Sequence, residues 1–290
     1  MCKNYTINNG RIVNAEVLDI TITSIDFWII EQCYYYDYFQ LSDFIIYQKA
    51  KLPKEIILSI LTFYHKKTTL KGVEGMETEY QISKGMLNSI YGMCVTDIVR
   101  EVIEYMYKNN QWASETDTKK SFTNEQMEEI LQHENESRKR FLFYAWGVFV
   151  TAYARRALWS GILEFKDDYI YSDTDSIYCR LTREQVEQFA KEANVELDPY
   201  KLGAWDIEQD NITRAIFLRQ KCYIKEIDGK ITATVAGCPK ALSRLFTFQN
   251  FKIGFTTADF TKEEIGKDGK LRFKQVDGGV ILQDTDFTIK

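Results

Sequence analysis

The chain has 290 residues, of which 45% are hydrophobic and 27% charged, so it can form one or two globular domains with a packed core. Its six cysteines contain no C-x-x-C pair and only two histidines are present, which argues against a structural zinc site and favours reduced thiols. The net charge is −5, but residues 211–290 carry 14 Lys and Arg against 9 Asp and Glu. A basic end section on an acidic body is typical of a module that binds a polyanion, although ordinary uneven surface charge explains it equally well.

The first part of the chain, residues 3–49, is predicted to form strands and turns. Asn8-Asn9-Gly10 is a turn signal, and isoleucines alternate with threonines over residues 20–23, before Asp26.

Two helices are predicted next. Apolar residues recur at helical spacing from Pro53 to His65, and the spacing resumes from Glu77 to Gly92. The lysine-rich stretch between them, residues 66–75, is expected to be a bend.

The polar stretch over residues 93–139 is predicted to hold two further helices. Apolar residues between Val99 and Met106 suggest the first, which is amphipathic. Thr123 and Gln126 resemble a capping box that opens the second, which is expected to end near Arg140.

An apolar helix is predicted over residues 141–164, and its strongly apolar run, Phe141 to Ala154, is too short to span a bilayer. Two strands, 168–171 and 177–179, should flank a turn, and a helix should follow over 183–193. Strands dominate after Phe217, with turn signals such as Asp228-Gly229, Asp268-Gly269 and Gly278-Gly279. No signal peptide or membrane partner is expected, so a cytoplasmic location, that of the host if the gene belongs to a phage, is predicted.

The predicted turn between the two strands carries a pair of carboxylates, Asp173 and Asp175. Residues two apart on an extended backbone point to the same side, and two carboxylates there are costly unless a cation neutralises them. Hard oxygen ligands suit Mg²⁺ or Mn²⁺. An EF-hand loop counted from Asp173 is excluded, because Tyr178 stands where glycine is needed and Ile177 has no side-chain oxygen. The pair alone is more often a surface turn than a metal site.

A second constellation lies on the helix predicted over residues 77–92. Lys84, Asn88 and Tyr91 are spaced i, i+4 and i+7, so they share one face, while Met86, Leu87 and Ile90 are expected to pack inward. An ammonium can meet a triphosphate and a phenol ring can stack on a sugar or base. Taken by itself, this pattern is better explained as an ordinary amphipathic helix with polar residues.

A third constellation is Arg219, Lys221 and Tyr223, which alternate onto one face if residues 218–223 form one strand. Such a row could contact phosphates, and a solvated strand face accounts for it about as well.

Taken in order, the three constellations resemble family B DNA polymerases. The run K-x-x-x-N-S-x-Y-G at 84–92 resembles motif B, Y-S-D-T-D-S at 171–176 resembles motif C, and Lys221 with Tyr223 resembles the K-x-Y motif. The protein-primed branch from small linear-genome phages is the most similar, through residues 201–205, 235–237 and the tail from Gly278.

The resemblance implies an α+β fold: a partial right-hand polymerase palm with helical fingers and a β-rich thumb. The implied segments are a partial palm or insertion remnant (1–66), fingers helices with motif B (67–92), a charged insertion (93–140), palm with motif C and K-x-Y (141–225) and thumb (226–290).

The resemblance also implies residue roles. Asp175 and its supporting neighbour Asp173 would ligate two Mg²⁺ or Mn²⁺ ions. The implied nucleotide-binding residues are Lys84, Lys67, Asn88, Tyr91, Tyr171 and Thr174, with Lys84 and Lys67 on the triphosphate and Tyr91 excluding a ribose 2′-hydroxyl. The implied DNA-binding residues are Ser89, Gly92, Arg219, Lys221 and Tyr223.

The sequence departs from the family in two regions. Motif A, an aspartate before a Ser-Leu-Tyr-Pro-like run, is missing, and Asp19 and Asp26 are the nearest candidates. The 3′–5′ exonuclease is missing too. We therefore expect primer–template DNA, dNTPs, a terminal protein and an N-terminal polymerase fragment that supplies motif A as partners. A split gene, a truncated product or one exon all fit, and a non-catalytic remnant that binds DNA or a terminal protein is the alternative.

Overall fold

The computed structural model describes residues 2–8, 11–96, 103–106, 111–114, 123–136, 143–266, 271–276, 279–284 and 286–290. The fold is α+β, as expected. The helices are α1 (Ser24–Cys33), α2 (Lys54–Leu70), α3 (Glu77–Cys94), α4 (Asn124–Glu136), α5 (Tyr144–Phe165), α6 (Arg183–Glu192) and the short α7 (Lys262–Ile265). The strands are β1 (Cys2–Asn8), β2 (Arg11–Leu18), β3 (Ile103–Met106), β4 (Gln111–Ser114), β5 (Tyr169–Asp173), β6 (Ser176–Cys179), β7 (Ile212–Arg219), β8 (Cys222–Ile227), β9 (Lys230–Val235), β10 (Leu271–Val276) and β11 (Gly279–Asp284).

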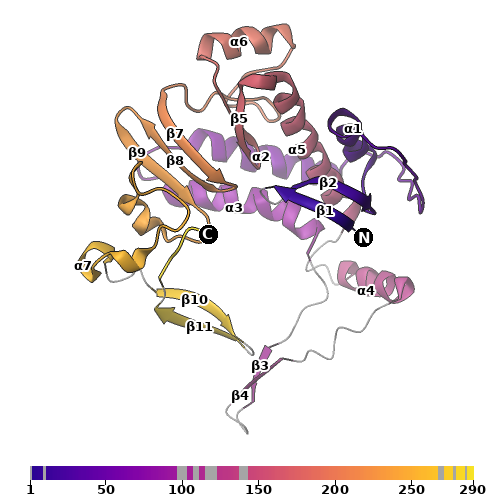
Figure 1. The fold of residues 1–290 in the computed structure, drawn as a ribbon. Coiled ribbons are helices and arrows are strands. Elements are labelled where there is room, and N and C mark those ends of the chain that lie inside the picture. Colours follow the sequence, from indigo (N-terminus) through magenta and orange to yellow (C-terminus); the bar gives the residue numbers. More distant parts are fainter. Residues whose placement is uncertain are drawn as a thin grey trace.

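These strands form small antiparallel units. Four are two-stranded, β1–β2, β3–β4, β5–β6 and β10–β11, and the fifth has the order β7-β8-β9. In Figure 1, α2 and α3 lie side by side, and their many contacts make them a helical hairpin. Asp228 and Gly229 both have positive φ, 51° and 74°, which confirms the predicted tight turn between β8 and β9.

The helical hairpin of α2 and α3 corrects two expectations. The bend predicted from Lys66 is wrong at its start, because α2 continues to Leu70 and the turn follows it. Met86 was expected to pack inward, but it is 48% exposed. The buried residues of α3 are Ser83 and Cys94, so the inward stripe passes beside Met86 rather than through it.

The C-terminal end of α3 packs closely against α5 at Gly147. A Cβ at this glycine would lie 2.0 Å from Cγ1 of Val95, so only glycine fits there without a shift. The Tyr144 hydroxyl donates to the carbonyl of Thr96 at 2.8 Å and fixes the start of α5 at the same place. The predicted apolar helix is thus confirmed as α5, which ties the helical hairpin to the β5–β6 hairpin that follows it.

The N-terminal prediction is right for β1 and β2 and wrong for α1. Thr23 and Asp26 form a capping box: the Thr23 hydroxyl oxygen accepts from the Asp26 backbone N–H, and the Asp26 carboxylate accepts from the Thr23 N–H, each at 3.1 Å. This local pair starts a helix where the Ile/Thr alternation suggested extended chain.

Between α3 and α5 the outcome is mixed. Ile103–Met106 is a strand paired with β4, so the amphipathic helix predicted here is wrong over those residues, and residues 97–102 lie outside the described chain. The capping box at Thr123 is confirmed, because its N–H donates to the Gln126 side chain at 3.0 Å and α4 follows. The expected end near Arg140 and the turn at Asp268-Gly269 also lie outside the described residues.

The best-packed core lies in the C-terminal part. Its buried members are Cys222, Ile224, Phe246, Phe248, Phe251, Phe255, Phe287 and Ile289. Because side chains alternate along a strand, β8 points Cys222 and Ile224 into this core and turns Tyr223 and Lys225 to its other face. The domain limits expected at 66/67, 92/93 and 225/226 fall inside α2, α3 and β8. No helix in the described ranges is both long enough and apolar enough to cross a bilayer.

Candidate functional site

The two carboxylates lie at the tip of the β5–β6 hairpin. Asp173 pairs with Ser176, so Thr174 and Asp175 are the two turn residues. The Asp175 N–H donates to the Asp173 carbonyl at 2.7 Å, and Ser176 Oγ donates to the same oxygen at 3.0 Å. Thr174 has φ 55°, which is unusual for a β-branched residue and costs about 1–3 kcal/mol. The turn is therefore tight and strained, as is common at functional sites.

The surroundings of the two carboxylates differ. The Asp173 side chain is 14% exposed, lies 3.8 Å from the Lys221 ammonium, and accepts from Thr174 Oγ1 at 3.1 Å. Asp175 is exposed at the tip. Both supply the hard oxygens that Mg²⁺ or Mn²⁺ prefers. Within the described residues, however, no group of three or more His, Cys, Asp or Glu side chains could hold an ion. The pair therefore fits part of a divalent-cation site.

The basic segment differs from its expected form. Gln220 and Lys221 form the turn between β7 and β8, and Lys221 has φ 53°. Arg219 and Tyr223 consequently lie on two antiparallel strands, and the prediction that they share one strand face with Lys221 is wrong. No Gly, Asn, Asp or Pro marks this turn, so turn chemistry could not reveal it. Arg219 Nε donates to the carbonyl of Lys290 at 3.1 Å.

The two turns meet at Lys221. Its backbone N–H donates to the Tyr171 hydroxyl at 2.8 Å, while its ammonium faces Asp173. Tyr171 is 7% exposed, and burial raises the pKa of its phenol, against the lowering effect of the Lys221 N–H. The structure thus joins the acidic turn to the basic turn by one hydrogen bond and one ion pair.

A cluster of four aromatic rings underlies this junction: Tyr171, Tyr178, Phe217 and Tyr223. Their centroids lie between 4.6 and 5.8 Å apart, and the Tyr171 and Phe217 rings are stacked. The Tyr178 hydroxyl donates to that of Tyr223 at 3.4 Å. Burial is the main cause that raises the pKa of Tyr178 well above its usual range. Tyr178 and Phe217 were missed from the sequence, although both are aromatic residues within a few positions of predicted site residues.

The polar face of α3 is present as predicted. Lys84, Asn88 and Tyr91 are all exposed. In the parts of the chain that the structure describes, no hydrogen bond or ion pair links these three residues to the Asp173–Asp175 turn.

The other residues assigned to this region have local contacts. Ser89 Oγ donates to the Gly85 carbonyl at 2.8 Å, and the Gly92 carbonyl accepts from Thr96 Oγ1 at 2.9 Å. Lys67 is half-buried on α2, with its ammonium 5.7 Å from the Tyr64 ring centroid.

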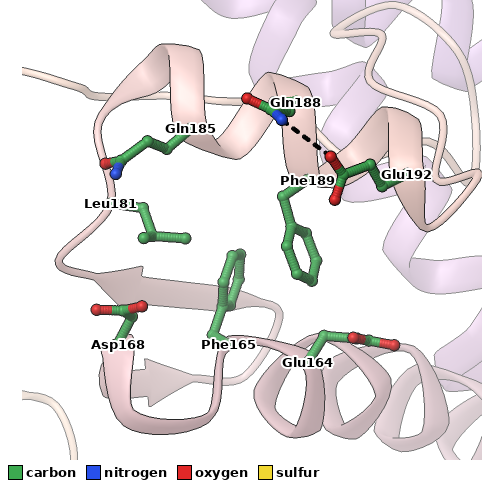
Figure 2. A pocket seen from close by; sticks show the side chains of 8 residues that line it. All are labelled: Glu164, Phe165, Asp168, Leu181, Gln185, Gln188, Phe189 and Glu192. Carbon is green, nitrogen blue, oxygen red and sulfur yellow. Dashed lines mark hydrogen bonds between the residues drawn. The ribbon is translucent and has the colours of Figure 1, made fainter.

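A shallow pocket lies elsewhere, between the end of α5 and α6 (Figure 2). Figure 2 shows Phe165 and Phe189 facing one another, with Asp168 and Glu192 around them. The two rings are 5.4 Å apart. None of its lining residues belongs to the two turns, so the candidate site is an open surface junction rather than this pocket.

Comparison with known proteins identifies relatives over almost the whole chain. The DNA polymerases of Bacillus phages B103 and phi29 are 30% and 29% identical to it over 99% and 95% of its length. That of Streptococcus phage Cp-1 is 28% identical over 80%. The chain spans less than half of the length of these relatives, 46%, 44% and 35%. No protein-family model matches.

Comparison with solved structures finds similar proteins of the same kind, phage DNA polymerases. Phi29 DNA polymerase complexed with primer-template DNA and incoming nucleotide substrates is 29% identical, with a TM-score of 0.54 over 82% of this chain and 37% of the other. The binary complex with primer-template DNA has a TM-score of 0.60 over 99% of this chain at 24% identity, which supports the fold alone.

Proposed function

Because the chain is homologous to phi29-type protein-primed phage DNA polymerases over 95–99% of its length, we propose that it takes part in template-directed DNA synthesis. The reaction would transfer a dNMP from a dNTP to a primer 3′-hydroxyl. The observation that carries this proposal is the junction of the Asp173–Asp175 turn with the Lys221 turn. It brings a carboxylate pair beside a cation that can meet DNA phosphate.

Asp173 and Asp175 are the residues that would hold Mg²⁺ or Mn²⁺. Held there, such ions would supply positive charge to the attacking 3′-oxygen and to the leaving pyrophosphate. The role of Asp173 includes holding Lys221, because its Oδ1 lies 3.8 Å from that ammonium. Asp175 is exposed at the tip, and among the described residues no ion pair engages it, so it is the principal ligand in this proposal.

The exposed face of α3 would bind the incoming nucleotide. Lys84 would meet the triphosphate as a point charge, and Tyr91 would lie against the sugar and reject a 2′-hydroxyl. Asn88 shares this face, and Lys67 on α2 would add a second phosphate contact. Tyr171 is buried with its hydroxyl engaged by Lys221, which supports a role for it in shaping the nucleotide pocket, beside the exposed Thr174.

The DNA strands would lie across the two turns and the end of α3. Lys221 and Tyr223 would grip the primer strand, with Arg219 nearby, and Ser89 and Gly92 would lie close to the template. In this proposal α2 and α3 form the fingers, β5 to β7 and the first part of β8 belong to the palm, and residues 226–290 to the thumb.

The described carboxylates are too few for two ions, so a further segment would supply the motif A aspartate. Asp26 does not fit that role well, because its carboxylate already accepts from Thr23 and from the Arg155 guanidinium at 2.8 and 3.1 Å. We propose a polymerase segment N-terminal to the matched region as the source, consistent with the 46% of the relative that the chain covers.

Primer extension tests the proposal. The chain is incubated with primer–template DNA, dNTPs and Mg²⁺, with and without an N-terminal polymerase fragment that contains motif A. Extension is expected only with the fragment, and robust extension by the chain alone would contradict the shared site.

In the complemented reaction, Asp175→Ala should lower kcat at least 100-fold, because removing a metal ligand costs several kcal/mol of transition-state stabilisation. The matched control is Asp167→Ala, an exposed aspartate at the other end of β5, which should leave kcat unchanged. Equal activity of Asp175→Ala and wild type would exclude the metal role.

A second candidate function is non-catalytic binding of DNA or of a terminal protein, which the incomplete carboxylate set favours. It predicts salt-dependent binding of primer–template DNA that is independent of Mg²⁺ and dNTP. Fluorescence anisotropy with and without both ligands distinguishes the two functions.

A further inference from the structure

Lys225 lies against two rings of the aromatic cluster, Tyr178 and Tyr223. Its ammonium donates to the Tyr178 hydroxyl at 3.2 Å and also contacts the Gln209 side chain. It lies 5.2 Å from the centroid of the Tyr178 ring and 5.9 Å from that of Tyr223. The half-buried ammonium therefore makes both hydrogen bonds and cation–π contacts.

A chain of contacts leads from Lys225 to the basic turn. The Tyr178 hydroxyl accepts from Lys225 and donates to Tyr223, and both rings contact Tyr171. The Tyr171 hydroxyl accepts the backbone N–H of Lys221. Hydrogen bonds at both ends of this series are joined by ring contacts in its middle, so a change at Lys225 can be transmitted to Lys221, 4 residues earlier in the sequence.

Strand geometry makes Lys225 suited to this task. Cys222 and Ile224, on the opposite face of β8, are fully buried in the C-terminal core and fix the strand. Tyr223 and Lys225 therefore face the β5–β6 hairpin from a rigid support. A polar group held by a rigid element can set the distance between two turns more accurately than the turns themselves can.

We propose that Lys225 is a positioning residue that acts through Tyr178 and Tyr223 to hold the Lys221 turn against the Asp173–Asp175 turn. It would touch neither nucleotide nor primer. The effect on DNA binding rests on the proposed function, whereas the effect on the Lys221 turn does not.

The first measurement is residue-resolved hydrogen exchange of the Lys221 amide in the full chain. Lys225→Met keeps the aliphatic stem but removes the charge and the donor, so Tyr178 loses a partner and the rings can shift. Protection of the Lys221 amide should fall about 3- to 10-fold, the range expected for one lost hydrogen bond or cation–π contact. Lys225→Arg should restore most of it.

The matched control is Lys230→Met, the same change at an exposed lysine of β9 in the same sheet. It should leave Lys221 protection unchanged. A double-mutant cycle tests the route: in a Tyr178→Phe background, Lys225→Met should have little further effect. Unchanged protection in Lys225→Met, an equal loss in Lys230→Met, or full additivity with Tyr178→Phe would each overturn the proposal.

The second measurement is the Kd for primer–template DNA by anisotropy. Lys225→Met should weaken binding about 3- to 10-fold, with Lys225→Arg close to wild type. If wild type does not bind primer–template DNA while Lys221 protection falls as expected, the proposed function fails and the positioning role stands. If wild type binds but neither quantity changes in Lys225→Met, the positioning role fails alone.

Discussion

At the scale of single residues, Lys221 and Asp26 show how one residue can join distant parts of the chain. Lys221 uses its backbone N–H for Tyr171 and its ammonium for Asp173, so it connects two hairpins. Asp26 caps α1 through Thr23 and binds Arg155 of α5 with both carboxylate oxygens. The contacts of Lys221 position groups of the candidate site, whereas those of Asp26 hold α1, which lies outside the site.

Asp26 provides a prediction about pH. Burial raises the pKa of the Asp26 carboxyl, but the hydrogen bonds from Arg155 and Thr23 lower it more, so its pKa lies below the usual 3.8. A carboxylate with a lowered folded-state pKa stabilises the fold above about pH 4, and this stability is lost as pH falls through the folded-state pKa. We expect Asp26→Asn to lower the free energy of unfolding by about 1–2 kcal/mol at pH 7.

The difference between Asp26→Asn and wild type should shrink below pH 3.8. Urea unfolding at pH 7 and at about pH 3 measures it. Asp37→Asn, at an exposed aspartate in the segment after α1, is the control and should cost less than about 0.5 kcal/mol. A difference from wild type that stays constant across this pH range would show that the carboxylate charge is not the cause.

At the scale of elements, strong local signals predicted structure well and weak ones did not. The capping box at Thr123, the apolar run of α5 and the Asp228-Gly229 turn were all readable because a local cause determines each. The turn at Gln220-Lys221 could not be predicted from local sequence, because neither residue has a strong turn preference. These residues adopt the turn because β7 pairs with β8. The apolar residues of Ile103–Met106 fit both the helical and the strand periodicity. Pairing with β4 makes this segment a strand.

The candidate site was predictable to a similar degree. Spacing indicated the carboxylate turn and the polar face of α3, and the resemblance of the ordered motifs to family B DNA polymerases implied their roles. It could not predict that Tyr171 and Lys221 bond to one another, because they are 50 residues apart and meet only when two hairpins dock. The roles of Tyr178, Phe217 and Lys225 depend on the same tertiary contact.

The contact of α3 with α5 leads to a paired prediction for two glycines. Gly147→Ala places a Cβ 2.0 Å from Val95 Cγ1, so it should lower the free energy of unfolding by about 1–3 kcal/mol. Gly85→Ala, inside α3 with nothing within 4 Å of the new Cβ, should raise it by about 0.5–1 kcal/mol. Thermal and urea unfolding of both variants measure the difference, and destabilisation by Gly85→Ala or stabilisation by Gly147→Ala would contradict this packing.

At the scale of the whole molecule, apolar surface is distributed unevenly. The segment after α1 has no helix or strand from Tyr34 to Pro53, yet it is rich in aromatic and aliphatic residues. Its most exposed large side chains are Tyr35, Tyr38, Phe44, Ile45 and Ile46, which are between 71% and 106% exposed. Only a few of its rings pack against another ring, for example Phe39, whose ring centroid lies 4.9 Å from that of Phe27. The C-terminal part, by contrast, buries five phenylalanines in one core.

This contrast predicts how the chain behaves in solution by itself. A continuous exposed apolar segment binds hydrophobic dyes and promotes self-association, whereas a single exposed apolar residue does not. The folded chain should therefore bind such a dye and sediment with a mass that rises with concentration. The double substitution Phe44→Asp with Ile46→Asp should reduce both effects, because two charges interrupt the segment without touching a packed core.

The control is Ile253→Asp, which places one aspartate, and so one of the two added charges, at an isolated residue that is 69% exposed. It should change neither dye binding nor sedimentation. If the double variant binds as much dye as wild type while its unfolding temperature is unchanged, the segment is not the apolar surface that the dye detects. If Ile253→Asp has the same effect as the double variant, net charge rather than the position of the apolar segment controls association, since both then act through repulsion between molecules.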